Sequence, residues 1–354
     1  MERMIRTDGQ TLFPPKATIR TVAAEAGVSI TTVSRYLNHP EKLNKATYDR
    51  IEEAICQTGY VPNLVASGLK SGTSRMLLLF VPDICNPFYS RMAKTLQRLA
   101  DENGSILMVF DTEEEVEREL AAISTARQVF ASGIFAASVY AADSVVQKLT
   151  ETGIPTVGIN SYPEGGPFDA VGVHHLGGTH LAVNHLIQLG HRDIVFAGGK
   201  PGTVIGESRK NGYLYAMEQA GIQVTPDMIC EEGFSQEAGY RAGMHFAKSS
   251  HMATAICCAN DLIAFGVIRA LSEIGISVPN AISVTGMDDT PFCSTSSPEL
   301  TSVTNDGEIF AQKAFQMMKE RIDRLYEGPS RFFEVPNELI VRRSTAVPRM
   351  LREH

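Results

Sequence analysis

The sequence predicts an α/β protein with a small all-α segment at its N-terminus and a larger core of two lobes built on parallel sheets. Two observations carry this prediction. Residues 17–38 read ATIRTVAAEAGVSITTVSRYLN, in which apolar residues recur at helical spacing on both sides of a glycine. From residue 75 onward, short apolar runs such as MLLLFV and PTVGIN alternate with amphipathic segments. That alternation is typical of parallel sheets covered by helices on both faces, and it is too long for a single sheet.

The N-terminal segment predicts two short helices joined by a tight turn. Thr18 is suited to cap the first helix, Gly27 to end it in a left-handed conformation, and Ser29 to cap the second. Two helices in this order form a helix-turn-helix, whose second helix is shaped to enter the major groove of DNA. An ordinary helical hairpin at a domain end is the alternative. Short polar side chains and one arginine, Arg35, on the outer face of the second helix favour DNA binding.

The rest of the N-terminal region fits this reading. Asn44 is expected to cap a third helix over Lys45–Thr58, and residues 1–16 are expected to form a disordered tail. Residues 1–75 hold ten Lys and Arg against seven Asp and Glu, whereas the remainder holds 22 against 33. A modestly basic head on an acidic body suits a protein that touches phosphates with one end only.

Several other classes of protein are disfavoured. No apolar run reaches the length of a membrane span and the first residues have no signal-peptide core, so a cytoplasmic protein with reduced cysteines is expected, without a membrane partner. The histidines at positions 174, 175, 180 and 185 have no Cys or carboxylate at ligand spacing, so no metal is expected. No G-x-G-x-x-G follows a strand, and no nucleophile, base and orienting group can be assembled. We therefore expect neither an enzyme nor a cofactor.

Polar residues at strand ends predict a ligand cleft. Ligands of open parallel sheets bind at the carboxyl ends of the strands, and between two lobes that rule places them in the cleft. The candidates by this rule are the segment Asp83–Phe88, which contains Asn86 and Phe88, together with Asn160, Asn260-Asp261 and Asp288-Asp289. Amides and carboxylates can pair with several hydroxyls of a sugar. The alternative is that Asn260 or Asp288 simply caps the next helix.

A set of ordered motifs runs through the chain. The pattern A-T-I-x-x-V-A-x-x-A-G-V-S-x-x-T-V-S-R is followed by G-Y-x-P-N at residues 59–63, V-A-x-x-L at 65–69 and V-R-R-S-T-A at 341–346. Together they resemble the lactose-repressor (LacI/GalR) family of transcriptional regulators. The resemblance implies a helix-turn-helix headpiece over 17–63, a hinge helix over 64–73, a periplasmic-binding-protein-like effector and dimerisation core over 74–346, and a short tail over 347–354. It places about 75–160 and 304–332 in lobe 1, and about 161–303 and 333–346 in lobe 2, with a last strand over 334–341.

The outward positions of the second helix and the resemblance together predict the DNA contacts. Base contacts are expected from Ile30, Thr31 and Arg35, and phosphate contacts from Thr18, Ser29, Thr32, Ser34 and Asn38. The resemblance adds Tyr60, Asn63 and Ala66, and it implies that Leu69 of the hinge wedges between base pairs in the minor groove.

The resemblance also completes the effector site. Arg209 lies in E-S-R-K-N-G-Y, which resembles the family's effector-binding S-x-x-R-x-x-G, and Phe234 stands where the family places a stacking aromatic residue. Asn305 replaces a frequent Gln, and His174-His175 replace a usual Asp-Asn. The resemblance implies that the protein is a homodimeric repressor. It would bind double-stranded operator DNA under the control of a carbohydrate effector. A purine or other metabolite as effector, or a sugar receptor without a DNA function, are the alternatives. The eight-residue tail is too short to join two dimers through a coiled coil.

Overall fold

The computed structural model describes residues 17–61, 74–249 and 253–349. The chain separates into two compact units between Ser74 and Arg75. The expected tail over 1–16 and hinge helix over 64–73 lie outside the described residues, as does the end of the expected C-terminal tail.

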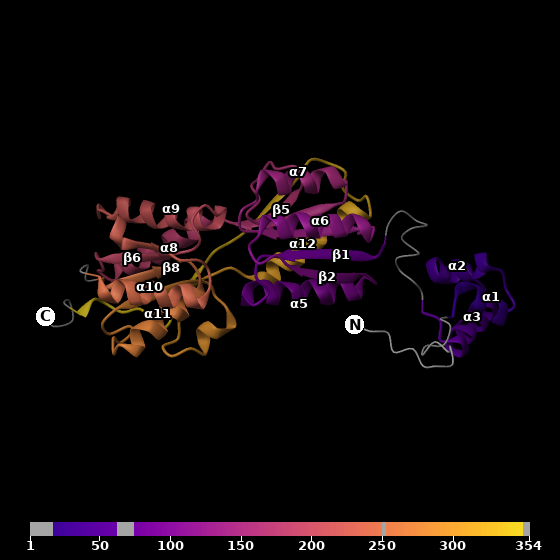
Figure 1. The fold of residues 1–354 in the computed structure, drawn as a ribbon, viewed down its shortest axis with the longest axis horizontal. Helices are drawn as coiled ribbons and strands as arrows, with labels where there is room; N and C mark the ends of the chain where they lie inside the picture. Colours follow the sequence, from indigo (N-terminus) through magenta and orange to yellow (C-terminus); the bar gives the residue numbers. More distant parts are fainter. Residues whose placement is uncertain (1–16, 62–73, 250–252, 350–354) are drawn as a thin grey trace, which may run out of the picture. The chain divides into compact units, whose positions relative to one another are not determined.

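The N-terminal unit is helical in its described part. It contains α1 (Ile19–Glu25), α2 (Ile30–Asn38), the 3-10 turn η1 (Pro40–Lys42) and α3 (Lys45–Thr58) (Figure 1). The apolar faces of the three α-helices meet in a small core made of Val22, Ala23, Ala26, Val33, Ile51 and Ala54.

The ends of these helices follow the predicted capping residues. Thr18 and Thr21 exchange hydrogen bonds in a capping box at the start of α1. Ser29 accepts a bond from the Thr32 amide, and Asn44 caps α3 through the Thr47 amide. Gly27 has a φ of 62°, which turns the chain from α1 toward α2. Local sequence therefore specifies where each helix of this unit begins.

The first lobe of the larger unit is a parallel sheet with the strand order β11-β5-β4-β3-β1-β2. Alternate residues of β1 serve its two faces: Leu77 and Leu79 pack in one core cluster, and Leu78 and Phe80 in another. The strands are β1 (Met76–Val81), β2 (Ile106–Asp111), β3 (Gly133–Ser138), β4 (Thr156–Asn160), β5 (Asp169–Val173) and β11 (Phe332–Val335), and the helices are α5 (Pro87–Glu102), α6 (Val116–Gln128), α7 (Asp143–Thr152) and α12 (Gly307–Ile322). Helix α12, late in the chain, packs beside α5 (Figure 1).

The second lobe has the strand order β12-β10-β9-β8-β6-β7, in which only β12 is antiparallel to its neighbour among the described strands. Its strands are β6 (Ile194–Gly198), β7 (Ile229–Glu231), β8 (Ala255–Cys258), β9 (Ser283–Asp288), β10 (Thr301–Thr304) and β12 (Leu339–Ile340), and its helices are α8 (His175–Gln188), α9 (Val204–Gln219), α10 (Gln236–Lys248) and α11 (Asp261–Glu273), with 3-10 turns η2 (Pro226–Met228) and η3 (Pro291–Ser294). Within the described residues, no helix combines the length and hydrophobicity needed to cross a membrane.

The predicted boundaries between the lobes are wrong at two places. The first lobe does not end near residue 160, because β5 pairs with β4 in the first sheet. The last strand expected over 334–341 is two strands: β11 pairs with β5 in the first sheet, and β12 with β10 in the second. The cause is visible at the start of β5, where the buried Asp169 carboxylate accepts bonds from Arg321 and Arg331. The ion pairs of Asp169 with Arg321 and Arg331 connect β5 to α12 and to the start of β11.

The chain passes between the lobes at three places. It leaves β5 for α8 through His174, leaves β10 for α12 through Asn305, and leaves β11 for β12 through residues 336–338. The last two crossings are hydrogen-bonded to one another: the Asn337 amide group donates to the Thr304 carbonyl at 2.7 Å, and the Thr304 N–H donates to the Glu338 carbonyl at 2.7 Å.

Candidate functional site

The outer face of α2 carries the predicted base contacts. Ile30 is 45 % exposed although it is a large apolar residue. Thr31 and Arg35 are also exposed, and Thr32 and Ser34 are half-buried. An isoleucine, a threonine and an arginine on one exposed helix offer an apolar contact for a thymine methyl group and a forked donor for a guanine.

Two of the predicted phosphate contacts, Thr18 and Ser29, lie at the helix ends. The hydroxyls of Thr18 and Ser29 cap α1 and α2, where free backbone N–H groups favour anions. Tyr60 is half-buried against the small core of the unit. The side chain of Asn38 and all of Asn63, Ala66 and Leu69 lie outside the described part of the chain.

The larger unit brings all eight predicted effector residues around one pocket between its lobes. The side chains are contributed by Asn86, Phe88 and Asn160 from the first lobe, by Arg209, Phe234, Asn260 and Asp288 from the second, and by Asn305 from a crossing segment. Five of the eight, from Asn86 to Asp288, were predicted because ligands bind at the carboxyl ends of parallel strands, and they span more than 200 positions of the chain.

A buried ion pair stands at the centre of the pocket. Asp288 Oδ1 accepts a hydrogen bond from Arg209 Nη2 at 3.2 Å and one from Asn305 Nδ2 at 3.1 Å. Arg209 Nη1 also donates to the carbonyl of Ala259. Arg209 is only 3 % exposed and Asp288 only 7 %. Burial raises the pKa of Asp288, and the guanidinium of Arg209 opposes that shift.

Two of the asparagines, Asn86 and Asn260, also cap helices, and the alternative given above had proposed this for Asn260. Asn86 caps α5 by accepting the Phe88 amide at 3.0 Å. Asn260 caps α11 by accepting the Ile263 amide at 2.8 Å, and its amide group donates to the Phe234 carbonyl at 3.0 Å. Asn260 therefore fixes both the start of a helix and the segment that carries the aromatic residue.

Phe88 and Phe234, the two predicted aromatic residues of the pocket, differ in how much of their ring surface is left to contact a ligand. Phe88 is 4 % exposed and packs edge-to-face against Phe310, with ring centroids 5.4 Å apart, so most of its surface serves the core. Phe234 is half-buried and lies over Gly199, where a Cβ atom would come within 2.2 Å of its ring. A glycine is therefore needed at position 199 for the ring to occupy this place.

Sequence reasoning missed several other residues of the pocket. Tyr89 and Glu114 line it together with Pro82, Val139 and Ile205, and Asp83 of the predicted segment 83–88 lines it as well. Tyr89 directly follows Phe88 at the start of α5, and that position was its available signal. Glu114 lies 4.0 Å from Lys200 of the other lobe; it comes from a loop after β2, and no pattern in the sequence pairs it with that lysine.

The pocket concentrates polar atoms that have no hydrogen-bond partner. Among the described residues that line it, the buried atoms without a partner include Asn160 Oδ1, Asn305 Oδ1 and Arg209 Nε. Burial and the nearby Arg209 lower the pKa of His175 to about 3, so this ring is neutral. Its neighbour His174 caps α8 by accepting the Gly177 amide at 2.9 Å. Buried polar groups are nearly always paired in native proteins, so such a concentration is typical of a ligand site.

The described residues contain no group of three or more His, Cys, Asp or Glu side chains that could hold a metal ion.

Comparison with known proteins agrees with this geometry. Residues 18–63 match the family described as bacterial regulatory proteins, lacI family, and residues 183–345 match a periplasmic binding protein-like domain. The chain is 32 % identical over 336 residues to the HTH-type transcriptional regulator DegA of Bacillus subtilis (strain 168), covering 94 % of this chain and 98 % of DegA.

Solved structures give the same result over the full fold. The Lac repressor dimer bound to operator and the anti-inducer ONPF is similar with a TM-score of 0.81 and 26 % identity, covering 94 % of this chain and all of that one. The complex of the transcriptional regulator CelR with cellobiose is similar with a TM-score of 0.70 and 26 % identity, covering 93 % of this chain and all of that one. The chain therefore belongs to the lacI family and is a DNA-binding transcriptional regulator, not an enzyme.

Proposed function

We propose that this regulator is a repressor whose operator binding is controlled by an uncharged sugar or sugar derivative in the cleft. The observation that carries the proposal is the set of unpaired atoms there: two amide oxygens, of Asn160 and Asn305, and one N–H, of Arg209. A hydroxyl both donates and accepts, so adjacent hydroxyls of one sugar can satisfy all three.

The charges of the cleft favour a neutral ligand. Its lining holds the carboxylates of Asp83, Glu114 and Asp288 against the single guanidinium of Arg209, which already faces Asp288. An anionic ligand would meet net repulsion in this setting. The half-buried ring of Phe234 offers an apolar surface for the C–H side of a sugar. CelR, a similar protein of known structure, is described as a complex with cellobiose.

We infer that the DNA-binding form is a homodimer. The Lac repressor, which has the same fold, is described as a dimer bound to operator. In this chain β2 is an edge strand that exposes Ile106 and Val109, and an exposed apolar edge is normally covered. A two-fold dimer that uses this edge and α5 would present two headpieces to two half-sites of a pseudo-palindromic operator. A ligand that favours one lobe arrangement would then change the fraction of dimers able to hold DNA.

Thermal unfolding of the full chain in the presence of a ligand panel tests the proposal. The panel contains neutral mono- and disaccharides, sugar acids and nucleobases. A ligand at about 100 times its Kd stabilises the native state by about 2.7 kcal/mol, which raises the midpoint by several degrees. We expect a neutral sugar to do so and to lose this effect in Asp288→Ala. Stabilisation by a nucleobase alone, or by a sugar in both Arg209→Ala and Asp288→Ala, would contradict the proposed ligand or pocket.

DNA control is tested on genomic fragments that the full chain selects. We expect the stabilising ligand to change the affinity for those fragments in a gel-shift assay, while Arg35→Ala weakens their selection over bulk DNA. Fragments bound equally by the Arg35→Ala chain would contradict the assignment of α2 as the reading helix. Light scattering at micromolar concentration should give a dimer, with or without residues 347–354; a stable monomer would contradict the two-headpiece mechanism.

A further inference from the structure

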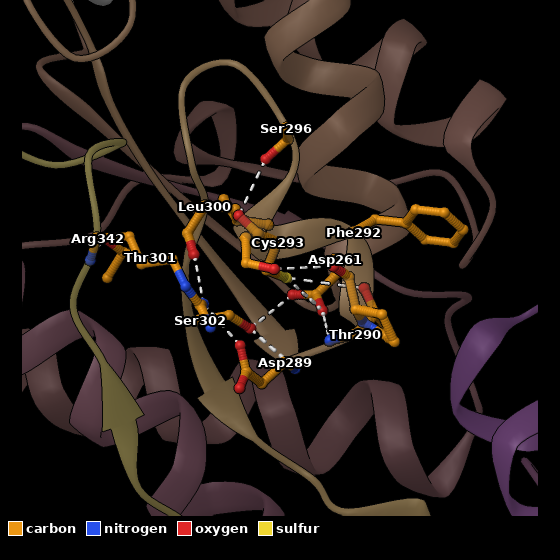
Figure 2. A network of polar contacts seen from close by, with 12 residues as sticks. Asp261, Asp289, Thr290, Phe292, Cys293, Ser296, Leu300, Thr301, Ser302 and Arg342 are labelled. Carbon is orange, nitrogen blue, oxygen red and sulfur yellow. Dashed lines mark hydrogen bonds and ion pairs between the residues drawn. The ribbon is translucent and has the colours of Figure 1, made fainter.

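A second network of buried polar groups lies behind the cleft and is centred on Asp261, the first residue of α11 (Figure 2). Its carboxylate accepts a hydrogen bond from the Ser302 hydroxyl at 2.6 Å, from the Thr290 N–H at 2.7 Å and from the Cys293 thiol at 3.1 Å. Asp261 is 1 % exposed, and it is not one of the described side chains that line the cleft. Burial of a carboxylate carries a desolvation cost, and the three hydrogen bonds that Asp261 accepts offset it. Those bonds fix the groups that donate them.

The network holds a strained segment. Asp288 and Asp289 have φ angles of 109° and 45°, in the left-handed region that non-glycine residues avoid. The peptide after them is held directly, because the Thr290 N–H donates to Asp261. The Asp289 N–H is held through a relay: it donates to the Ser302 hydroxyl at 3.2 Å, and that hydroxyl donates to Asp261. Both amides that follow Asp288 are therefore fixed by one carboxylate.

The same segment is tied to the C-terminal motif over 341–346. Arg342 Nη1 donates to Asp289 Oδ1 at 2.6 Å and to the Leu300 carbonyl at 2.8 Å. The Arg342 N–H donates to the Thr301 hydroxyl at 2.9 Å. The arginine thus bridges Asp289 and the beginning of β10, and it holds the strained segment from the side opposite to Asp261 (Figure 2).

The backbone around Asp261 leaves room for its carboxylate. A Cβ atom at Gly286 of β9 would come within 2.4 Å of Asp261 Oδ1. Strand β9 therefore needs a glycine at this position so that the Asp261 side chain can reach the residues beyond the strand.

We propose that Asp261 is a positioning residue for the effector cleft. By holding the amides of Asp289 and Thr290, it keeps Asp288 where its carboxylate meets Arg209 and Asn305. This role rests on the proposed function of the cleft, and it extends that function to a residue that touches no ligand. If a ligand displaces Asp288, we expect Asp289 and Arg342 to move with it, because Arg342 Nη1 donates a hydrogen bond to Asp289 Oδ1.

The charges that face Asp261 are consistent with this role. The groups are the Asp288 carboxylate and the thiols of Cys258 and Cys293, with Arg342 on the far side of Asp289. Burial and the Asp288 charge raise the pKa of Asp261 to about 7, and its three hydrogen-bond donors oppose the shift. Asp261→Asn would remove only the charge, because the Ser302 hydroxyl can accept from the new N–H₂ group, whereas Asp261→Ala removes the acceptors of all three hydrogen bonds.

Two measurements on the full chain test the proposal without ligand or DNA. The first is hydrogen exchange in the peptide over 286–293. The second is the rate at which phenylglyoxal modifies Arg209, followed by mass spectrometry. In Asp261→Ala and Ser302→Ala we expect both rates to rise by about tenfold or more, because Asp288 leaves Arg209. Ser302→Thr keeps the hydroxyl and should stay within about twofold of the wild type.

Ser283→Ala is the matched control, since Ser283 is a buried serine at the opposite end of β9 that bonds the chain at Ala346. It should lower stability without changing either rate. Unchanged rates in Asp261→Ala and Ser302→Ala would overturn the proposal. A rise in Ser283→Ala, or in Ser302→Thr equal to that in Ser302→Ala, would do the same, because general loosening or packing would then explain the effect. If no sugar stabilises the protein but these rates behave as expected, the proposed ligand fails and the positioning role stands.

Discussion

Replacement of Asp288 should separate the two activities of the regulator, because this residue belongs to the cleft and not to the headpiece. Both of its described hydrogen bonds end on Oδ1, with Arg209 and Asn305 as donors. Asp288→Ala removes the acceptor and the charge together, whereas Asp288→Asn can keep the acceptor and loses only the charge. The pair of substitutions therefore measures the two contributions one after the other.

The magnitude follows from the burial of the pair. The side chains of Arg209 and Asp288 are 4 % and 6 % exposed. Removing one partner of a buried ion pair leaves the other charge uncompensated and typically costs about 3–5 kcal/mol. We expect Asp288→Ala to lower the free energy of unfolding by about this amount. Asp288→Asn should cost about 1.5–3 kcal/mol, the usual contribution of a hydrogen bond to a charged group. Relief of the repulsion between Asp288 and Asp261 moves both values toward the lower end.

Urea unfolding followed by circular dichroism measures the stability, and a gel shift measures DNA binding. The control is Glu308→Gln, which removes an exposed ion pair of Arg91 at 3.6 Å and should cost less than about 0.5 kcal/mol. Binding of selected DNA fragments without ligand should stay within about twofold of the wild type in all variants. A cost of Asp288→Ala no larger than that of the control, or an equal loss of DNA binding, would refute the reasoning.

Three further substitutions test the headpiece and the first lobe. Arg35→Ala should flatten the sequence preference at one base pair per half-site, by about 1–3 kcal/mol in gel shifts on operator variants; uniform weakening on all sequences would make Arg35 a phosphate contact only. Gly27→Ala should destabilise the headpiece by about 1–2 kcal/mol in thermal unfolding, because a left-handed φ strains any residue with a Cβ although no atom lies within 4 Å of its position. Unchanged stability would contradict the assigned turn. Burial raises the pKa of Glu119 to about 7, so the native state keeps a proton that the unfolded chain releases above about pH 4.5, and stability should fall by up to about 3 kcal/mol as the pH rises through that window. Glu119→Gln should remove this fall, and a pH profile of unfolding identical to that of the wild type would contradict it.

The helices of the headpiece could be predicted closely because their signals are local. Thr18, Ser29 and Asn44 each bond an amide within three residues along the chain, and Gly27 supplies the left-handed turn by itself. The residues of the cleft were also accessible, because parallel strands end at one edge of a sheet and the resemblance added Arg209 and Phe234. In both cases the signal is contained in a short stretch of sequence.

The lobe boundaries could not be predicted because their cause is not local. The apolar run at β5 fits either sheet equally well. Its place is decided by Asp169, whose side chain is fully buried between Arg321 and Arg331. Those arginines lie more than 150 residues further along the chain. No periodicity or motif near β5 indicates this pairing, so the expected boundary at residue 160 was too early by one strand.

The same reasoning explains why the role of Asp261 could not be predicted, although its place after the apolar run made it a candidate for the cleft beside Asn260. Both follow the apolar run of β8, and helix capping accounts for Asn260 from sequence alone. The partners of Asp261 lie on the segment after β9 and on β10, and its role depends on the positive φ angles of Asp288 and Asp289. A strained backbone is not visible in residue types, since two aspartates in a row suggest only a polar turn. If Asp261 positions Asp288, the cleft is specified by two layers of residues, and their place at the ends of strands does not tell which residue faces the ligand and which one holds another in position.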